Sequence, residues 1–367
     1  MVTRHSTQVL CCVLVFSLCD VAQPCSTLLL PVPGRAVFAR SYDFFFGDGQ
    51  VIVNPRGLRK TALMLGTPAQ WDSRYGSVTF SQFGREFPCG GINEAGLAIA
   101  VLWLHEAEYP QVDDRPAVNE VQWVQYQLDT ATTVKDVLAS DAEIRIQPLS
   151  QTKLHYFVAD RSGDCAVIEF LDGKLVARHA DGLQCPVLTN STYADSLKNF
   201  TSGGTAEERA QLRADPENPL VRGRRFARIA AMVEKFDTAK DDPIEYAFRS
   251  LETVRQGNFT RWQIVYDLKQ SVIWFRTGAS PERRQVDLRK LDFEASAGAR
   301  VMDIDLKASG DVTTKFEPWT PELNRRLIER SLSQAGFLKV PDFVKQMAIH
   351  YPASLRPAGE RLPATTE

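Results

Sequence analysis

The sequence predicts an α+β fold of four layers, in which two antiparallel β-sheets pack face to face and helices cover their outer faces. Short apolar, β-prone segments recur along the chain and are joined mostly by tight turns, which indicates antiparallel strands. Pairs of amphipathic helical segments separate the blocks of strands, and an apolar helix face needs a sheet to bury it. No repeat or internal linker interrupts this pattern, so we expect a single domain.

The first two strands form a predicted hairpin that brings reactive side chains together. The segments 25–30 and 36–43 are apolar and β-prone, and the turn between them contains two prolines and a glycine. On this hairpin Arg40 and Asp43 fold back over the end of the first strand, where Cys25 lies. Taken alone, Arg40 and Asp43 are more typical of a surface ion pair at a strand end.

The remaining elements follow from periodicity and capping signals. Helices are predicted at 118–128, at a second short segment capped by Thr132 or Thr133 and ending near 138, and at about 220–236, 242–255 and 320–335, the last capped by Thr320. Residues 90–96 are predicted as a tight turn and the polar segment 201–218 as a loop. Further strands are predicted at 50–57, 78–83, 97–104, 154–160, 165–170, 174–176, 262–268 and 272–276.

Length and composition are those of a globular protein. The chain has 367 residues, of which 44% are hydrophobic and 24% charged, and its net charge is −2 at pH 7. This charge gives no electrostatic footprint for nucleic acid or for an anionic membrane. We therefore predict no nucleic-acid partner.

Residues 1–24 have the pattern of an export signal. Arg4 and His5 precede an apolar run at 9–19, which is too short to cross a bilayer. No later segment is long and apolar enough to do so. We predict that the leader is removed, that the chain has no stable membrane insertion, and that it is periplasmic or secreted. The mature domain is then 25–351, and the Pro-rich polar tail at 352–367 is predicted to be disordered.

The junction before Cys25 is unusual for a signal peptidase. Ala22, three residues before Cys25, suits that enzyme, but Pro24 directly before the cut does not. Cleavage just upstream, followed by self-removal of the remaining residues, is the alternative. Either route leaves Cys25 with a thiol and a free α-amine in one residue.

Four cysteines remain after removal of the leader: Cys25, Cys89, Cys165 and Cys185. An exported protein meets an oxidising environment, so Cys165 and Cys185 could form a disulfide, although their spacing alone does not establish it. The five histidines are scattered and no cysteine or histidine pair has metal-ligand spacing. We predict no metal site and no cofactor.

A cysteine and six segments, in this order, resemble the penicillin V acylase and choloylglycine (bile-salt) hydrolase family of N-terminal-nucleophile hydrolases. Each segment is weak evidence by itself, but together they span most of the mature chain. The resemblance implies the four-layer αββα sandwich of that family. The matching residues are Cys25, then 40–43, 54–57, 91–97, 188–190, 224–228 and 264–269.

The resemblance also implies roles for individual residues. Cys25 would be the nucleophile, with its α-amine as general base, and Arg40 and Asp43 would flank them. Asn190 would help to hold the oxyanion, and Arg225 would complete the polar cluster.

The sequence departs from the family pattern at Trp103, where the family carries an asparagine or a tyrosine. An indole offers one N–H donor and no acceptor. We therefore expect a backbone N–H to serve the oxyanion and Trp103 to form an aromatic wall for the acyl group. Phe45 and Phe46 directly follow the catalytic strand and are expected to line the acyl pocket, although such a run is also typical of a core.

These residue types suit amide cleavage. An α-amine with a pKa of about 7.7–8.0 can accept the proton of a thiol whose pKa is about 8.5, and can return it to the leaving nitrogen. Arg40 is expected to lower the thiol pKa by favouring the thiolate, and Asp43 to orient the amine. An amide side chain such as that of Asn190 can donate to the oxyanion.

The predicted function is an exported cysteine amidohydrolase that cleaves a small-molecule, linear N-acyl amide through a thioester. Penicillin V, conjugated bile salts and N-acyl-homoserine lactones are the substrates that the resemblance implies. Two alternatives are an acyltransferase that passes the thioester to an amine, and a catalytically inactive binding protein on the same fold. The sequence leaves open whether the chain forms a homo-oligomer.

Overall fold

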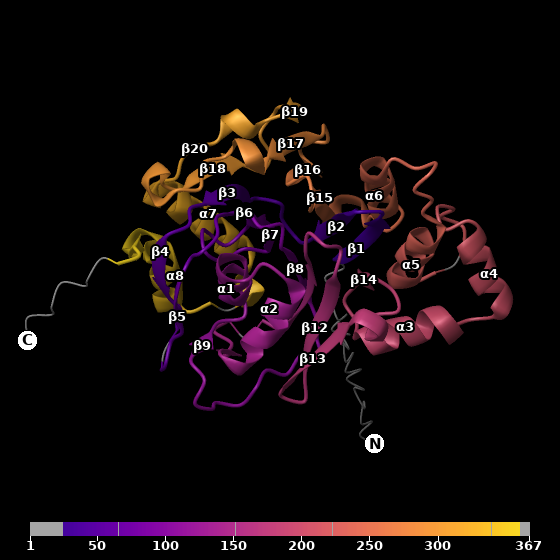
Figure 1. Cartoon of the computed structure of the whole chain (residues 1–367), viewed down its shortest axis with the longest axis horizontal. Helices are drawn as coiled ribbons and strands as arrows, with labels where there is room; N and C mark the ends of the chain where they lie inside the picture. Colours follow the sequence, from indigo (N-terminus) through magenta and orange to yellow (C-terminus); the bar gives the residue numbers. More distant parts are fainter. Residues whose placement is uncertain (1–24, 65, 151, 222, 339, 360–367) are drawn as a thin grey trace, which may run out of the picture.

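Two large β-sheets form the centre of the computed structural model, which describes residues 25–64, 66–150, 152–221, 223–338 and 340–359 (Figure 1). The first sheet has the strand order β14-β1-β2-β15-β16-β17-β19. The predicted hairpin β1–β2 therefore lies inside this sheet, between β14 and β15. The bounds are β1 Ser26–Val32, β2 Arg35–Asp43, β14 Val187–Leu188, β15 Thr260–Asp267, β16 Val272–Thr277, β17 Arg284–Asp287 and β19 Gly310–Asp311.

The second sheet has the strand order β13-β12-β11-β8-β7-β6-β3-β18-β20. Neighbouring strands in both sheets pair antiparallel, except β17 and β19, which pair parallel at the edge of the first sheet. The bounds are β3 Gln50–Asn54, β6 Ser77–Ser81, β7 Gly90–Asn93, β8 Ala98–Trp103, β11 Leu154–Ala159, β12 Cys165–Leu171, β13 Lys174–His179, β18 Arg300–Asp303 and β20 Glu317–Pro318.

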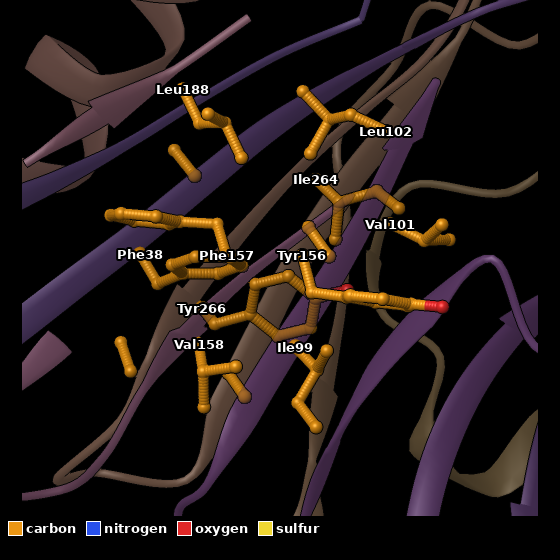
Figure 2. Packing of buried hydrophobic residues seen from close by; sticks show 14 of the residues in the cluster. Phe38, Ile99, Val101, Leu102, Tyr156, Phe157, Val158, Leu188, Ile264 and Tyr266 are labelled. Carbon is orange, nitrogen blue, oxygen red and sulfur yellow. The ribbon is translucent and has the colours of Figure 1, made fainter. Parts of the chain in front are cut away.

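The main core lies between these two sheets. Phe38 of β2 stacks on Phe157 of β11, with ring centroids 5.5 Å apart, and both side chains are fully buried (Figure 2). Phe80 of β6 meets Phe275 of β16 edge to face at 5.5 Å. Because each pair joins one strand from each sheet, the apolar faces of the two sheets pack directly on each other.

Helices cover the outer faces of both sheets. Helices α5 (Arg225–Lys235) and α6 (Pro243–Glu252) pack on the first sheet, against β1, β2, β14 and β15. Helix α1 (Gln122–Thr130) packs on β7 and β8 of the second sheet, and α2 (Val134–Ala139) follows it with Thr133 in a capping box. The predicted four-layer α+β sandwich is confirmed.

Residues 201–218, predicted as a loop, are mostly helical. Helices α3 (Tyr193–Ser202) and α4 (Ala206–Ala214) occupy this region. Each is capped by a threonine, and Thr205 forms a capping box with Glu208 that supplies hydrogen bonds for the start of α4. The polar composition of this segment reflects a solvent-exposed helix surface, and the prediction missed the caps.

Residues 90–93, predicted as part of a turn, form strand β7 between β6 and β8. A Cβ atom on Gly91 would lie 2.5 Å from the Val78 carbonyl oxygen of the neighbouring strand. The glycines here allow a close approach between strands, and the reversal of the chain is confined to residues 93–97.

The C-terminal region forms two helices, α7 (Pro321–Gln334), capped by Thr320 as predicted, and α8 (Asp342–His350). Strand β21 (Arg356–Pro357) then pairs with β4 (Leu58–Thr61), which also pairs with β5 (Gln70–Asp72). Residues 352–359 therefore differ from the disordered tail predicted from position 352, because their backbone completes this small sheet. Strands β9 (Ala117–Val118) and β10 (Arg145–Ile146) form a further parallel pair.

The structure bears on the predictions about membrane insertion and the disulfide, but not on those about the leader. None of the helices within the described residues has the length and apolar character needed to cross a bilayer. The leader at 1–24, the Pro24–Cys25 junction and residues 360–367 lie outside the described residues. Cys165 and Cys185 carry free thiols, as do the other two cysteines that the structure describes.

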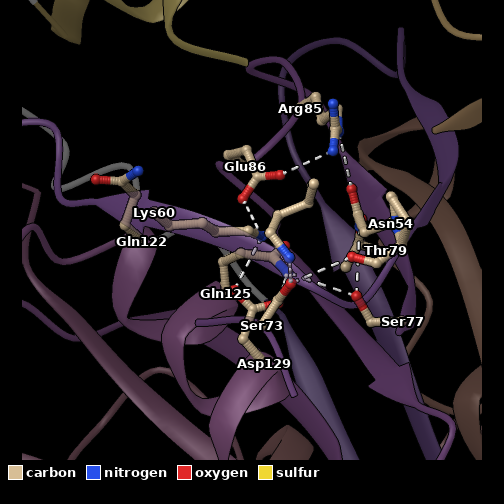
Figure 3. A network of polar contacts seen from close by, with 12 residues as sticks. Asn54, Lys60, Ser73, Ser77, Thr79, Arg85, Glu86, Gln122, Gln125 and Asp129 are labelled. Carbon is tan, nitrogen blue, oxygen red and sulfur yellow. Dashed lines mark hydrogen bonds and ion pairs between the residues drawn. The ribbon is translucent and has the colours of Figure 1, made fainter. Parts of the chain in front are cut away.

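A buried ionic network holds the loop that joins β6 to β7 (Figure 3). The Lys60 ammonium on β4 contacts Glu86 Oε2 at 2.6 Å and Asp129 Oδ2 at 2.9 Å, and all three side chains are fully buried. Arg85 lies 3.3 Å from Glu86 Oε1 and donates to Asn54 Oδ1 at 3.2 Å. Two cations thus balance two carboxylates, which satisfies the requirement that buried charges are paired.

Candidate active site

The β1–β2 hairpin places Cys25 at the open end of β1, beside the end of β2. Ser26 lies opposite Ser41 in the antiparallel ladder. Cys25, which precedes Ser26, therefore lies at the end of β2, where Asp43 is located. The Cys25 thiol lies 3.8 Å from the Asp43 carbonyl oxygen, and Cys25 is 5% exposed. Local strand pairing therefore brings together the two residues that the sequence places 18 positions apart.

Arg40 is buried beneath this site and is held by backbone carbonyl groups. Its guanidinium donates to the Cys89 carbonyl oxygen and, at 3.2 Å, to the Val101 carbonyl oxygen, and lies over the Tyr42 ring. A Cβ atom on Gly90 would lie 2.8 Å from Arg40 Nη1, so the missing side chain at this position leaves room for the guanidinium.

Asp43 is fully buried but only partly hydrogen bonded. Its Oδ2 accepts a hydrogen bond from the Ser41 hydroxyl at 3.1 Å, whereas Oδ1 has no partner among the described residues. Burial raises the pKa of the Asp43 carboxyl to about 6, against the opposing effects of the Thr260 hydroxyl and the Arg225 charge. The free Oδ1 can therefore accept a hydrogen bond from a further donor.

Arg225 and Asn190 connect Cys25 to the second sheet. Arg225, the first residue of α5, donates to the Cys25 carbonyl oxygen at 2.7 Å, to Ser26 Oγ at 3.0 Å and to Asn190 Oδ1 at 3.3 Å. Asn190 Nδ2 in turn donates to the Trp103 carbonyl oxygen at 2.8 Å. One of the two Nδ2 hydrogens remains available to another acceptor.

Arg40 acts to lower the pKa of the Cys25 thiol, as expected, but it does not set the net shift. Burial raises the pKa of the thiol to about 11, because the loss of hydration outweighs the favourable charges of Arg40 and Arg225. In this environment the thiol is protonated at neutral pH. A base is therefore needed to remove its proton.

An apolar cavity of about 150 Å³ opens at the Cys25 thiol. Its walls include Tyr42 and Trp103 from the two sheets, Phe44 from the segment after β2, Ile328 of α7 and Val344 of α8. The expectation that Trp103 forms an aromatic wall agrees with this position. Its lining is almost entirely carbon, which suits an apolar group.

Phe45 and Phe46 do not line this cavity, in contrast to the prediction. Phe45 is 40% exposed and packs against Phe259 at 5.2 Å, whereas Phe46 is buried and meets Phe44 edge to face at 4.9 Å. The chain leaves β2 at Asp43, so strand alternation no longer sets which side these rings face. Phe44 is the member of the run that reaches the cavity.

Sequence reasoning missed the groups that hold Arg40 and Asp43 in place. The Cys89 and Val101 carbonyl groups belong to the backbone, so no residue type signals them. Thr260 acts on Asp43 because β15 pairs with β2, and Thr260 lies opposite Asp43 in that ladder. In the sequence, the family match at 264–269 was the only signal that this strand lies near the site.

Two polar residues of the matching segments lie in structural positions. Asn93 donates to the Leu128 and Ala131 carbonyl oxygens at 2.9 and 2.8 Å, which ties the β7–β8 turn to the end of α1. Arg56 contacts Glu94 at 2.7 Å. Both residues fix loops rather than contact Cys25.

Comparison with known proteins finds relatives in the family that the sequence resembles. A penicillin V acylase from Pectobacterium atrosepticum is 30% identical over 334 residues, covering 79% of this chain and 88% of the relative. The solved penicillin V acylase of Agrobacterium tumefaciens superposes with a TM-score of 0.68 at 25% identity, covering 81% of this chain and 98% of that chain.

A solved variant of the conjugated bile acid hydrolase of Clostridium perfringens has the same fold, with a TM-score of 0.61 at 19% identity over 76% of this chain and 96% of that chain. Residues 25–209 match the family described as linear amide C–N hydrolases, choloylglycine hydrolase family. The chain therefore belongs to the choloylglycine hydrolase family and is a hydrolase that acts on linear amide C–N bonds.

Proposed function

We propose that this chain is exported to the periplasm or secreted, loses residues 1–24, and uses Cys25 as an N-terminal nucleophile to hydrolyse a small N-acyl amide. The observation that carries this proposal is the position of Cys25. It lies at the end of a buried strand and at the wall of an apolar cavity, within reach of Asp43 and Arg225. Family membership supports the reaction class.

The first half of the reaction transfers the acyl group to sulfur. The α-amine of processed Cys25 accepts the thiol proton while sulfur attacks the amide carbon, and Asp43 Oδ1 accepts a hydrogen bond from that amine. The free N–H of Asn190 stabilises the oxyanion of the tetrahedral intermediate. When the C–N bond breaks, the ammonium returns the proton to the leaving nitrogen, and a thioester remains.

The second half releases the acid. Water, deprotonated by the α-amine, adds to the thioester carbon, and the thiolate leaves and regains the proton. Arg40 and Arg225 lie close enough to stabilise the thiolate, which partly offsets the cost of its burial. Self-removal of the residues before Cys25 would use the same nucleophile.

The cavity supports a compact apolar acyl group. A volume of about 150 Å³ with an apolar lining is comparable to a cavity that binds benzene. A phenoxyacetyl group matches this description better than a steroid or a long alkyl chain. Among the candidates from the sequence, penicillin V is therefore the first to test.

Two measurements test the proposal. Intact-mass spectrometry of the exported protein should show a chain that begins at Cys25, and a mature chain that retains Pro24 would contradict it. Purified protein should release phenoxyacetate from penicillin V, and Cys25→Ala should abolish this release. Near-wild-type hydrolysis by Cys25→Ala would rule out the nucleophile, and acyl transfer to an added amine in place of hydrolysis would favour the acyltransferase.

A further inference from the structure

A buried pair of titratable side chains, His155 and Glu169, has no part in the reaction as described so far. His155 lies on β11 and Glu169 on β12, and both are almost completely buried. Tyr156 lies opposite Ile168 in the ladder of these antiparallel strands, so His155 and Glu169 form the next pair in register. Because a buried ionisable group without partners is costly, the contacts of this pair indicate what it holds in place.

Glu169 contacts the start of α3. Its Oε1 accepts a hydrogen bond from the backbone N–H of Tyr193, the first residue of α3, at 2.9 Å. The first N–H groups of a helix have no partner within the helix, and a negative charge at this end is favourable. The cap residue Thr192 accepts from Asp195, one turn further on. Glu169 therefore fixes the point on β12 at which α3 begins.

His155 holds the Glu169 carboxylate on its other side. His155 Nδ1 lies 3.4 Å from the same Oε1 atom, whereas Nε2 has no hydrogen-bond partner among the described residues. Phe157, two residues further along β11, stacks on Phe38 of the first sheet, so His155 also faces that sheet. The pair is therefore enclosed inside the sandwich, and the ring contributes its polar contact to Glu169.

The start of α3 in turn sets the position of Asn190. This residue lies in the short segment 189–192, which joins β14 to α3. At one end of the segment Leu188 pairs with Thr27 of β1, directly beside the nucleophile strand's free end. The other end is the helix start that Glu169 holds. Few backbone conformations of so short a segment are compatible with two fixed ends.

We propose that Glu169 is a positioning residue for amide cleavage, because it anchors the segment that carries the Asn190 amide. The hydrogen bonds with Arg225 and with the Trp103 carbonyl oxygen orient this amide, and the Glu169 contact fixes its backbone. Donors that stabilise an oxyanion act only when they are held in place before the reaction. The inference rests on the proposed function, since Glu169 acts through the proposed oxyanion donor.

The test measures kcat and KM for penicillin V. Glu169→Ala removes the acceptor and should lower kcat by roughly 10- to 100-fold, because a small displacement of a reacting group is enough for such a loss. KM should change by less than about threefold, since Glu169 is not among the described residues that line the apolar cavity. Glu169→Gln keeps an oxygen that can accept from the Tyr193 N–H, and its kcat should stay within about threefold of the wild type.

Asp160→Ala is the matched control. Asp160, directly after β11, is 3% exposed and accepts a hydrogen bond at 3.0 Å from the N–H of Val134, the first residue of α2. The described lining of the apolar cavity contains no residue of α2. Loss of this acceptor should therefore lower stability and leave kcat within about threefold of the wild type.

A second variant applies if Glu169→Ala does not fold. Glu169→Asp keeps the buried charge beside His155 but withdraws the carboxylate from the Tyr193 N–H. It should lose about tenfold in kcat, while Glu169→Gln, which keeps the reach and loses the charge, should not.

A double-mutant cycle with Asn190→Ala tests the route of the effect. If Glu169 acts through Asn190, adding Glu169→Ala or Glu169→Asp to Asn190→Ala should lower kcat by less than about threefold. A general disturbance of the site would instead cost the same factor in both backgrounds.

The outcomes separate this inference from the proposed function. A wild-type kcat in folded Glu169→Ala or in Glu169→Asp, a Glu169→Gln variant as slow as these, equal losses in the two backgrounds, or an equal loss in Asp160→Ala would overturn the positioning role alone. Failure of the wild-type enzyme to cleave penicillin V, or a wild-type kcat in Asn190→Ala, would instead overturn the proposed function or its oxyanion donor.

Discussion

At the scale of single residues, the chemistry of the site is set by burial as much as by neighbouring charge. Cys25 has two arginines nearby, yet the pKa of its thiol is raised to about 11 because it is removed from water. Asp43 shows the same effect, since burial favours its neutral form and raises its pKa to about 6. In the proposed reaction, the buried thiol and the buried carboxyl therefore both depend on the α-amine that processing at Cys25 would release.

Asp43→Asn should slow catalysis and change the pH dependence of stability. Because the folded-state pKa, about 6, lies above the ordinary value of 3.8, the native state binds more protons than the unfolded state between these values. Stability therefore falls as pH rises through this window, by an amount of the order of 1–3 kcal/mol. The variant should lack this fall while losing at least about 100-fold in kcat.

Urea unfolding at pH 4 and pH 7, together with kcat, checks this prediction. A free α-ammonium at Cys25 lowers the pKa of Asp43, so the window should be narrower in the processed chain than in an unprocessed one. The difference in unfolding free energy between the wild type and Asp43→Asn should change between pH 4 and pH 7. An unchanged difference would contradict the raised pKa.

Gly90→Ala should displace the Arg40 guanidinium. The new Cβ atom would lie 2.8 Å from Arg40 Nη1 and 2.6 Å from the Ile99 carbonyl oxygen, so one of them must move. We expect a loss of roughly 1–3 kcal/mol in unfolding free energy, typical of overpacking, and a lower kcat. Gly182→Ala is the matched control, since nothing lies within 4 Å of its Cβ position.

At the scale of elements, helices α7 and α8 extend the site beyond the two sheets. Their residues close the apolar cavity that opens at Cys25, and α7 also holds the β6–β7 loop, where Ser331 Oγ donates to the Gln82 carbonyl oxygen at 2.6 Å. The proposed acyl site is thus formed in part by a segment that lies about 300 residues from Cys25 in the sequence.

Val344→Trp should narrow the acyl cavity. Val344 is buried in its wall, so the larger ring occupies space that an acyl group would use. We expect KM for penicillin V to rise by at least about tenfold, equivalent to 1.4 kcal/mol, with a smaller change for an acetyl amide.

The neighbouring Phe343→Trp serves as the control for Val344→Trp, because Phe343 is 56% exposed and lies outside the cavity lining. Equal effects of the two substitutions on KM would show that α8 does not form part of the acyl site.

At the scale of the whole molecule, the Lys60–Glu86–Asp129 network joins the small sheet, the β6–β7 loop and α1. Burial raises the pKa of Asp129, while the Lys60 ammonium opposes this effect. The loop that the network holds carries the Cys89 carbonyl group that binds Arg40. The ionic cluster therefore supports the site from a distance, through backbone position.

Lys60→Met should destabilise the fold by about 3–5 kcal/mol, because it leaves buried Asp129 without a cation and Glu86 with Arg85 alone. Guanidinium unfolding at pH 7 measures the change. The control is Arg59→Gln on β4, the strand that also carries Lys60. It removes an exposed ion pair with Asp72 and should cost less than about 1 kcal/mol. A Lys60→Met variant as stable as Arg59→Gln would show that the network contributes little.

The sequence by itself determined the fold class, the hairpin and the cluster around Cys25. Strand alternation and turn residues act locally, so β1, β2 and the position of Arg40 beside Thr27 could be predicted. The ordered matches placed Asn190 and Arg225 near the same point, and in the structure Arg225 donates hydrogen bonds to both Cys25 and Asn190. The threonine caps of α3 and α4 were also present in the sequence but were masked by polar composition.

Only the tertiary structure decided which aromatic ring faces the acyl cavity and how far the thiol is buried. Phe44, rather than Phe45 or Phe46, reaches the cavity because the chain leaves the sheet after Asp43. The pKa of the thiol depends on desolvation by burial. The apolar cavity at Cys25 is lined by residues from both sheets and from α7 and α8. These properties arise from groups distant in sequence, so no local pattern encodes them.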